Sequence, residues 1–154
     1  MPLTDVVLIE DNRHDIEMIF DALREHNLNC SIVALTDGAK GLEYFFGGEG
    51  CVHIKGARLP RLVLLDLKLP KVNGLEVLKE LKGDERTRHV PVVVFTSSNE
   101  YCDKQESYAL FVNSYLVKPL DAEKFSRFVA KTVKYWLTIN TTSYFDPLES
   151  ELDL

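Results

Sequence analysis

The sequence predicts an α/β domain built on an open parallel β-sheet, and two observations support this prediction. Short apolar runs rich in β-branched residues are typical of buried parallel strands. Reactive side chains directly follow these runs: Glu10-Asp11, Asp66, Thr96 and Lys118. In an open parallel sheet all strands end at one edge, where ligands bind. We therefore expect three carboxylates, a hydroxyl and an ammonium to converge there.

Five strands are expected to alternate with five helices, and short links between them favour right-handed crossovers. The expected strands are residues 6–9, 31–35, 62–66, 92–96 and 114–117. The expected helices are residues 13–26, 38–46, 73–83, 101–112 and 121–137. The first helix carries an apolar stripe for packing on a sheet: Ile16, Ile19, Phe20 and Leu23. Asp37 is placed to cap the second helix, and Gly83 to end the third.

Two segments depart from a minimal alternating layout. The link at residues 47–60 is longer than usual and holds four glycines, so we expect a surface loop. The tail after Leu137 carries many apolar side chains among its acidic ones. We divide the chain into a domain at residues 1–138 and a C-terminal extension at residues 139–154.

Composition narrows the function classes. The chain has 154 residues, 45% of them hydrophobic and 27% charged, which suits one globular domain. A net charge of −6 argues against a nucleic-acid surface and gives no support for binding to an anionic membrane. No apolar stretch is long enough to span a bilayer, and the N-terminus lacks the basic start of a signal peptide. Three widely spaced cysteines suggest no disulfide framework, so we expect a cytoplasmic protein with mostly packed, reduced thiols.

The carboxylates Glu10, Asp11 and Asp66 predict a metal site. Packed together without a counter-ion, they would repel each other. Mg²⁺ prefers such oxygen ligands, whereas zinc and copper would need histidine or cysteine, which these motifs lack. The backbone carbonyl of Lys68 could add a further ligand. Any single acid here could merely end a strand or cap a helix, and only the set of three favours a metal.

Asp66 is the candidate nucleophile. A carboxylate can attack a phosphoryl donor and form an aspartyl phosphate. The metal, the Lys118 ammonium and the Thr96 hydroxyl could then neutralise the three equatorial oxygens. Alone, Lys118 could be a surface lysine and Thr96 a strand-end hydroxyl.

These motifs resemble the receiver domain of two-component response regulators, over about residues 4–137. The resemblance includes the pair Glu10-Asp11, the segment 64–70 around Asp66, the segment 95–98 around Thr96, and Lys118-Pro119. It implies a flavodoxin-like doubly wound sheet with strand order 2-1-3-4-5, and Asp66 as phosphoacceptor of a sensor histidine kinase. Such a protein is a signalling switch, which catalyses only its own phosphorylation and dephosphorylation.

Within that family the chain is similar to single-domain regulators of cyanobacterial-type phytochrome histidine kinases. The shared features are the long loop 47–60, segment 66–74, the region 107–115 and Tyr135-Trp136-Leu137. Two positions depart from the commonest pattern: Glu10 stands where Asp is usual, and Asn73 replaces a frequent Asp. The Glu10-Asp11 pair leaves metal binding intact, and Asn73 looks like a turn substitution without consequence for the chemistry.

Three further expectations concern switching and output. The resemblance implies a cis peptide between Lys118 and Pro119, and a two-state element made of Thr96 and Tyr115. Too few residues follow Pro119 for a DNA-binding domain, so output should be a protein contact. We also expect a homodimer through the fourth helix, the fifth strand, the fifth helix and the tail. The apolar residues in or beside this face are Phe111, Val112, Phe128, Val129, Val133, Tyr135, Trp136 and Leu137, with Tyr144, Phe145 and Leu148 from the tail. The tail could instead fold back over its own domain.

Two other functions remain open. An aspartate-nucleophile phosphatase of the haloacid dehalogenase type needs its nucleophile after the first strand and a second Asp two residues on. Asp66 follows the third strand, and Lys68 holds the second position, which disfavours that class. A receiver-like module that binds partners without switching would not need Asp66, Thr96 and Lys118 together.

Overall fold

The computed structural model describes residues 4–47 and 59–144. A sheet of five parallel strands has the order β2-β1-β3-β4-β5, as the resemblance implied. Its strands are β1 (Val6–Ile9), β2 (Ile32–Leu35), β3 (Leu62–Leu65), β4 (Val92–Thr96) and β5 (Ser114–Val117). The helices are α1 (Arg13–Glu25), α2 (Gly38–Phe46), α3 (Gly74–Gly83), α4 (Tyr101–Ala109) and α5 (Ala122–Lys134), followed by the π-helical turn η1 (Tyr135–Ile139).

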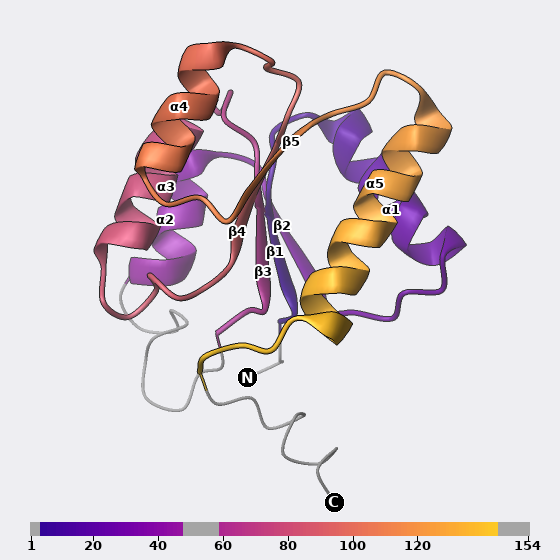
Figure 1. Ribbon diagram of the computed structural model, residues 1–154, viewed down its shortest axis with the longest axis horizontal. Coiled ribbons are helices and arrows are strands. Elements are labelled where there is room, and N and C mark those ends of the chain that lie inside the picture. The colour runs from indigo at the N-terminus through magenta and orange to yellow at the C-terminus, as the bar shows by residue number, and fades with distance from the viewer. Residues whose placement is uncertain (1–3, 48–58, 145–154) are drawn as a thin grey trace, which may run out of the picture.

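Helices cover both faces of the sheet, with α2, α3 and α4 on one side and α1 and α5 on the other (Figure 1). Side chains of the central strands alternate between two cores because successive residues of a strand point to opposite faces. Val7 and Ile9 belong to the core beneath α2 and α3, whereas Val6 and Leu8 belong to the core beneath α1 and α5. Burial on both faces explains why these strands are continuous apolar runs.

Capping residues start the helices near the edge where the strands end. The side chains of Asn12, Asp37, Asn73 and Asp121 each accept a backbone N–H from the first turn of α1, α2, α3 and α5 respectively. These bonds satisfy amide groups that lack partners within the helix. The expected cap at Asp37 is therefore confirmed, and Asn73 caps α3 in the same way.

The C-terminal helices differ from their expected bounds. Helix α4 ends at Ala109, and Phe111 then adopts a left-handed backbone with φ of 67°. Helix α5 ends as a regular helix at Lys134 and widens into η1. The Tyr144 hydroxyl donates a hydrogen bond to the Pro60 carbonyl, and its ring packs on the core beneath α2 and α3. The tail thus folds back on its own domain as far as Tyr144.

The expected interaction face needs a correction. Val112, Val129 and Val133 were expected in or beside it, but all three are buried in the cores of the domain and offer no surface to a partner. Val129 and Val133 are buried because they are four residues apart and so lie on the same face of α5, the face that packs on the sheet. Phe111, Phe128 and Tyr135 are exposed, and Trp136 and Leu137 are partly buried against the core beneath α1. Phe145 and Leu148 lie outside the described residues.

Candidate metal and phosphoacceptor site

Three carboxylates meet where β1 and β3 end. Glu10 and Asp11 follow β1, and the Asp66 backbone N–H donates to the Ile9 carbonyl across the strands, with an N–O distance of 3.0 Å. Oxygens of Glu10, Asp11 and Asp66 lie within 4.8 Å of one another. Glu10 is 1% exposed and Asp66 6%, whereas Asp11 is open to solvent. Two of the three carboxylates are therefore largely removed from water.

The Lys118 ammonium lies over this cluster. Its Nζ is 2.6 Å from Glu10 Oε2 and 3.1 Å from Asp66 Oδ2. A third carboxylate, Asp15 on the first turn of α1, has its Oδ2 at 2.8 Å from the same nitrogen. Only 7% of the Lys118 side chain is exposed, so these are short ion pairs away from bulk water.

The expected cis peptide between Lys118 and Pro119 was wrong, since no described peptide bond is cis. The trans form is the more stable one for an X–Pro bond by about 0.5–1 kcal/mol. With this trans bond, the backbone N–H of Lys118 donates to the Thr96 carbonyl at 2.7 Å, and the ammonium reaches Glu10, Asp15 and Asp66.

Charge in this site is out of balance. The pKa of Glu10 is raised to about 7, first by burial and then by the negative charge of Asp66, against hydrogen bonds from Lys118 and Asn12 that lower it. Burial lowers the pKa of Lys118, but the Asp15 hydrogen bond and the charges of Asp66 and Glu10 outweigh it and raise that pKa overall. One ammonium thus serves more carboxylates than it can neutralise.

The donor set of the cluster suits a hard divalent cation. Glu10, Asp11 and Asp66 offer only carboxylate oxygens, which Mg²⁺ and Mn²⁺ accept and which zinc and copper prefer less than nitrogen or sulfur. A second described group, Glu100, Cys102 and Asp103, lies at the start of α4. It includes the exposed thiol of Cys102, which departs from the expectation of mostly packed cysteines.

Thr96 and Tyr115 are linked through one loop. Thr96 is fully buried at the end of β4, and its hydroxyl oxygen accepts the Ser98 backbone N–H at 3.3 Å. The half-buried Tyr115 on β5 donates its hydroxyl to the Ser98 carbonyl at 2.9 Å. Burial raises the pKa of the Tyr115 phenol, which keeps it a donor. Movement of Thr96 would therefore strain a bond that Tyr115 makes.

The loop after β3 packs tightly beneath Asp66. The Lys68 backbone N–H points at Asp66 Oδ1, 3.4 Å away, while its exposed ammonium lies 3.8 Å from Asp103 Oδ2. The Gly74 N–H donates to the Leu67 carbonyl at 2.9 Å, which closes the loop. The Lys68 carbonyl remains a predicted ligand.

Asp15 and Asp103 were not predicted as parts of this site. Asp103 accepts a hydrogen bond from the Ser98 hydroxyl and faces Lys68, so it joins the two loops at the mouth of the site. The only signal for Asp15 was its place in the first turn of a helix, which an acid also occupies for the helix dipole alone.

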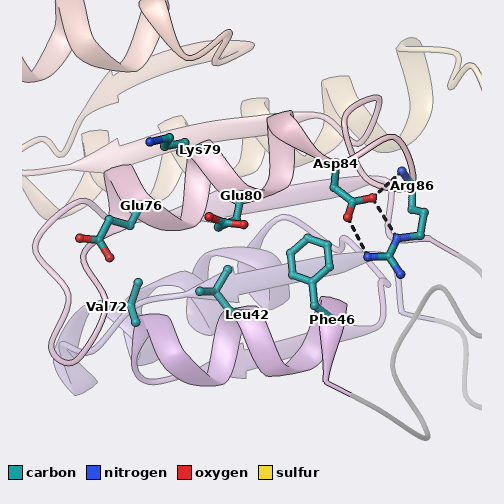
Figure 2. Close-up of a pocket in the computed structure, with 8 residues that line it drawn as sticks. All are labelled: Leu42, Phe46, Val72, Glu76, Lys79, Glu80, Asp84 and Arg86. Atoms are coloured by element: carbon teal, nitrogen blue, oxygen red, sulfur yellow. Dashed lines mark hydrogen bonds and ion pairs between the residues drawn. The ribbon is translucent and has the colours of Figure 1, made fainter.

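A groove of about 650 Å³ lies between α2 and α3, apart from the acidic cluster (Figure 2). Leu42, Phe46 and Val72 form apolar patches, and α3 adds Glu76, Lys79 and Glu80. Arg86 closes one end, where it pairs with Asp84 and lies over the Phe46 ring at 5.6 Å. None of these lining residues belongs to the carboxylate site.

Comparison with known proteins gives one family. The pattern that describes the response regulator receiver domain matches residues 6–130. Two curated relatives cover most of this chain. One is the probable methanogenesis regulatory protein FilR2 of Methanothrix harundinacea, 43% identical over 88% of this chain and 84% of the relative. The other is response regulator Rcp1 of Synechocystis, 33% identical over 86% of this chain and 88% of the relative.

Solved structures agree with this result. The phosphorylated cyanobacterial phytochrome response regulator RcpA superimposes with a TM-score of 0.82 at 34% identity, over 93% of this chain and 100% of that one. The Mn²⁺-bound form of Rcp1 gives 0.80 at 30% identity, over 92% and 99%. The predicted resemblance to phytochrome response regulators and the predicted fold are thus confirmed. Among the described residues no helix is long and apolar enough to cross a membrane.

Proposed function

Because this chain belongs to the response regulator receiver domain family, we propose that it accepts a phosphoryl group on Asp66 from a sensor histidine kinase. One observation carries the proposal: the carboxylate oxygens of Glu10, Asp11 and Asp66 lie within 4.8 Å of one another, and the buried Lys118 ammonium pairs with two of these acids, Glu10 and Asp66. That arrangement has the charge for a divalent cation and a phosphoryl group together.

Each residue has a distinct part in this reaction. An Asp66 oxygen attacks phosphorus, the bond from phosphorus to the donor nitrogen breaks, and the imidazole leaves with that electron pair. Glu10, Asp11, Asp66 and the Lys68 carbonyl would hold Mg²⁺, which supplies positive charge to the phosphoryl oxygens. Lys118 and the Thr96 hydroxyl serve the remaining oxygens.

The signal then passes through Thr96 and Tyr115. A phosphoryl group on Asp66 would draw the Thr96 hydroxyl inward and disturb the loop whose Ser98 carbonyl accepts from Tyr115. The Tyr115 ring would then move into the space that Thr96 leaves. Structures with and without beryllofluoride test this step, and an unchanged Tyr115 rotamer with an unmoved Thr96 loop would count against it.

The kinase is best sought among phytochrome-like sensors. The likeness to RcpA and Rcp1 supports this choice. A sensor kinase of another kind is the alternative, because the methanogenesis regulatory protein is 43% identical to this chain and Rcp1 is 33% identical. Phosphotransfer from a panel of the host's histidine kinases would separate the two.

The output is a protein contact made in the cytoplasm, without nucleic acid or membrane. The receiver unit is residues 1–138, and the extension 139–154 contributes to assembly. We propose a homodimer through α4, β5, α5 and the tail. All seven large apolar side chains that are exposed among the described residues lie between Tyr101 and Ile139, which supports this face.

Labelling with acetyl phosphate tests the function. Wild type should take up label in Mg²⁺, and neither Asp66→Asn nor wild type in EDTA should do so, because attack needs the carboxylate and the cation. Equal label in the variant would refute the assignment of Asp66. Sustained turnover of a phosphomonoester would instead favour the phosphatase. If Asp66→Asn binds its partners as wild type does, the result would favour a module that does not switch.

A further inference from the structure

The Lys118 ammonium has no spare donor. An ammonium carries three N–H groups, and the nitrogen lies within 3.1 Å of three carboxylates, those of Glu10, Asp15 and Asp66. A bond from Lys118 to a phosphoryl oxygen therefore requires that one of these acids be released.

Asp15 differs from the other two acids in its origin. Glu10 and Asp66 follow strands and belong to the cluster that fits a metal, whereas Asp15 is absent from that cluster and comes from α1. Its backbone N–H donates to the Asn12 side chain at 3.0 Å, which fixes it in the first helical turn. Its side chain is 20% exposed.

We infer that Asp15 is a positioning residue that holds Lys118 back from a phosphoryl group on Asp66 and so weakens the retention of that group. This inference rests on the proposed function.

Two physical effects act in the same direction. A cation held by Glu10 and Asp66 would neutralise part of their negative charge and so weaken their hydrogen bonds to Lys118. Asp15, which does not bind the cation, would keep its full charge. Charge-assisted hydrogen bonds are the strong ones, so Asp15 competes directly with a phosphoryl oxygen for the ammonium. The Asp15 charge also repels the incoming anion.

The test separates the affinity for a phosphoryl mimic from the affinity for metal. Asp15→Asn and wild type are titrated with beryllofluoride in saturating Mg²⁺ and followed by ¹⁹F NMR, and each is titrated with Mg²⁺ alone. We expect the variant to bind beryllofluoride about three- to tenfold more tightly, from the loss of one charged competitor. Its affinity for Mg²⁺ should stay close to that of wild type.

Glu17→Gln is the matched control. It makes the same change of charge on the same helix, but Glu17 is 62% exposed and pairs with Arg13. It should leave both affinities unchanged. Asp15→Glu, which keeps the charge, should bring beryllofluoride binding back toward that of wild type. Thermal melts by circular dichroism verify that each variant is folded.

The outcomes are distinct. If Asp15→Asn binds beryllofluoride as wild type does, or more weakly, the restraint on Lys118 does not exist. A parallel fall in both affinities would mean that Asp15 only supports the structure, which also overturns the inference. A wild type that binds no beryllofluoride would instead overturn the proposed function itself.

Discussion

Gly74 stands where the chain has no room for a side chain. A Cβ there would lie 2.2 Å from the Asp66 carbonyl oxygen and 2.6 Å from the Leu67 Cα, both backbone atoms that cannot rotate away. We predict that Gly74→Ala lowers the free energy of unfolding by about 1–3 kcal/mol, the usual cost of overpacking. The variant should also lose phosphoryl uptake, because the loop that holds Asp66 must shift. Urea unfolding and acetyl phosphate labelling measure the two effects.

Gly83→Ala provides the control on the same helix. A Cβ at Gly83 meets nothing within 4 Å, and alanine favours a helix over glycine by up to about 1 kcal/mol. This variant should be as stable as wild type or more stable, with normal labelling. Equal losses in the two variants would show that helix propensity, rather than space beneath Asp66, explains the effect.

Residues of the site differed in how far the sequence could predict them. Glu10, Asp66 and Lys118 follow strands, and the topology of a parallel sheet brings strand ends together regardless of detail. Asp15 reaches Lys118 only because of how α1 is rotated on the sheet. The spacing of residues along the chain carries no measure of that rotation, so an acid in a first helical turn looked ordinary.

At the scale of elements, Lys82 ties the end of α3 to the start of β4. Its ammonium donates to the Arg88 and Val90 carbonyls and to the Asn113 side chain, at 3.2, 2.9 and 2.8 Å. We predict that Lys82→Met lowers the free energy of unfolding by about 1–3 kcal/mol, because it removes three hydrogen bonds, including the one to the partly buried Val90 carbonyl oxygen. Chemical unfolding measures this loss. Lys79→Met on the same helix is the control, and an equal loss there would contradict the role of Lys82.

The same lysine should make stability depend on pH. Burial lowers the pKa of Lys82 from 10.5 to about 8. Between those values the unfolded chain binds more protons than the folded one, so the free energy of unfolding from this group rises with pH. This contribution to stability is fully present above pH 10.5 and is lost as the pH falls through about 8. We predict that wild type gains stability relative to Lys82→Met between pH 8 and 10.5; a constant difference would contradict the lowered pKa.

Elements were predictable where burial dictates their pattern. The central strands are buried on both faces, and their apolar runs marked the ends of β1 and β4 correctly. The end of α4 was missed because Leu110, Phe111 and Val112 continue an apolar pattern with no glycine to stop it. The chain turns there through a left-handed Phe111, a conformation that bulky residues rarely adopt.

At the scale of the whole molecule, apolar exposure is uneven. Among the described residues, the helices α1, α2 and α3 contribute no large apolar side chain to the exposed set. All of the set comes from α4, α5, the link between β5 and α5, and the segments directly after the two helices. The sequence predicted a face of this kind but not its composition, because which valines of α5 turn inward depends on packing. Tyr144 also covers its own core, which reduces the part of the tail left for a partner.

Phe111 offers the sharpest test of self-association. Its side chain is 78% exposed at a φ of 67°, a conformation that asparagine tolerates better than phenylalanine. We predict that Phe111→Asn keeps or raises the stability of the monomer while it weakens the dimer about tenfold or more, as loss of a central aromatic contact does. Sedimentation equilibrium with and without beryllofluoride measures the association, and Phe111→Tyr, which keeps the ring, should still associate. A wild type that stays monomeric at high concentration in both states would exclude the dimer, and a Phe111→Asn variant that associates as wild type does would exclude this residue from its interface.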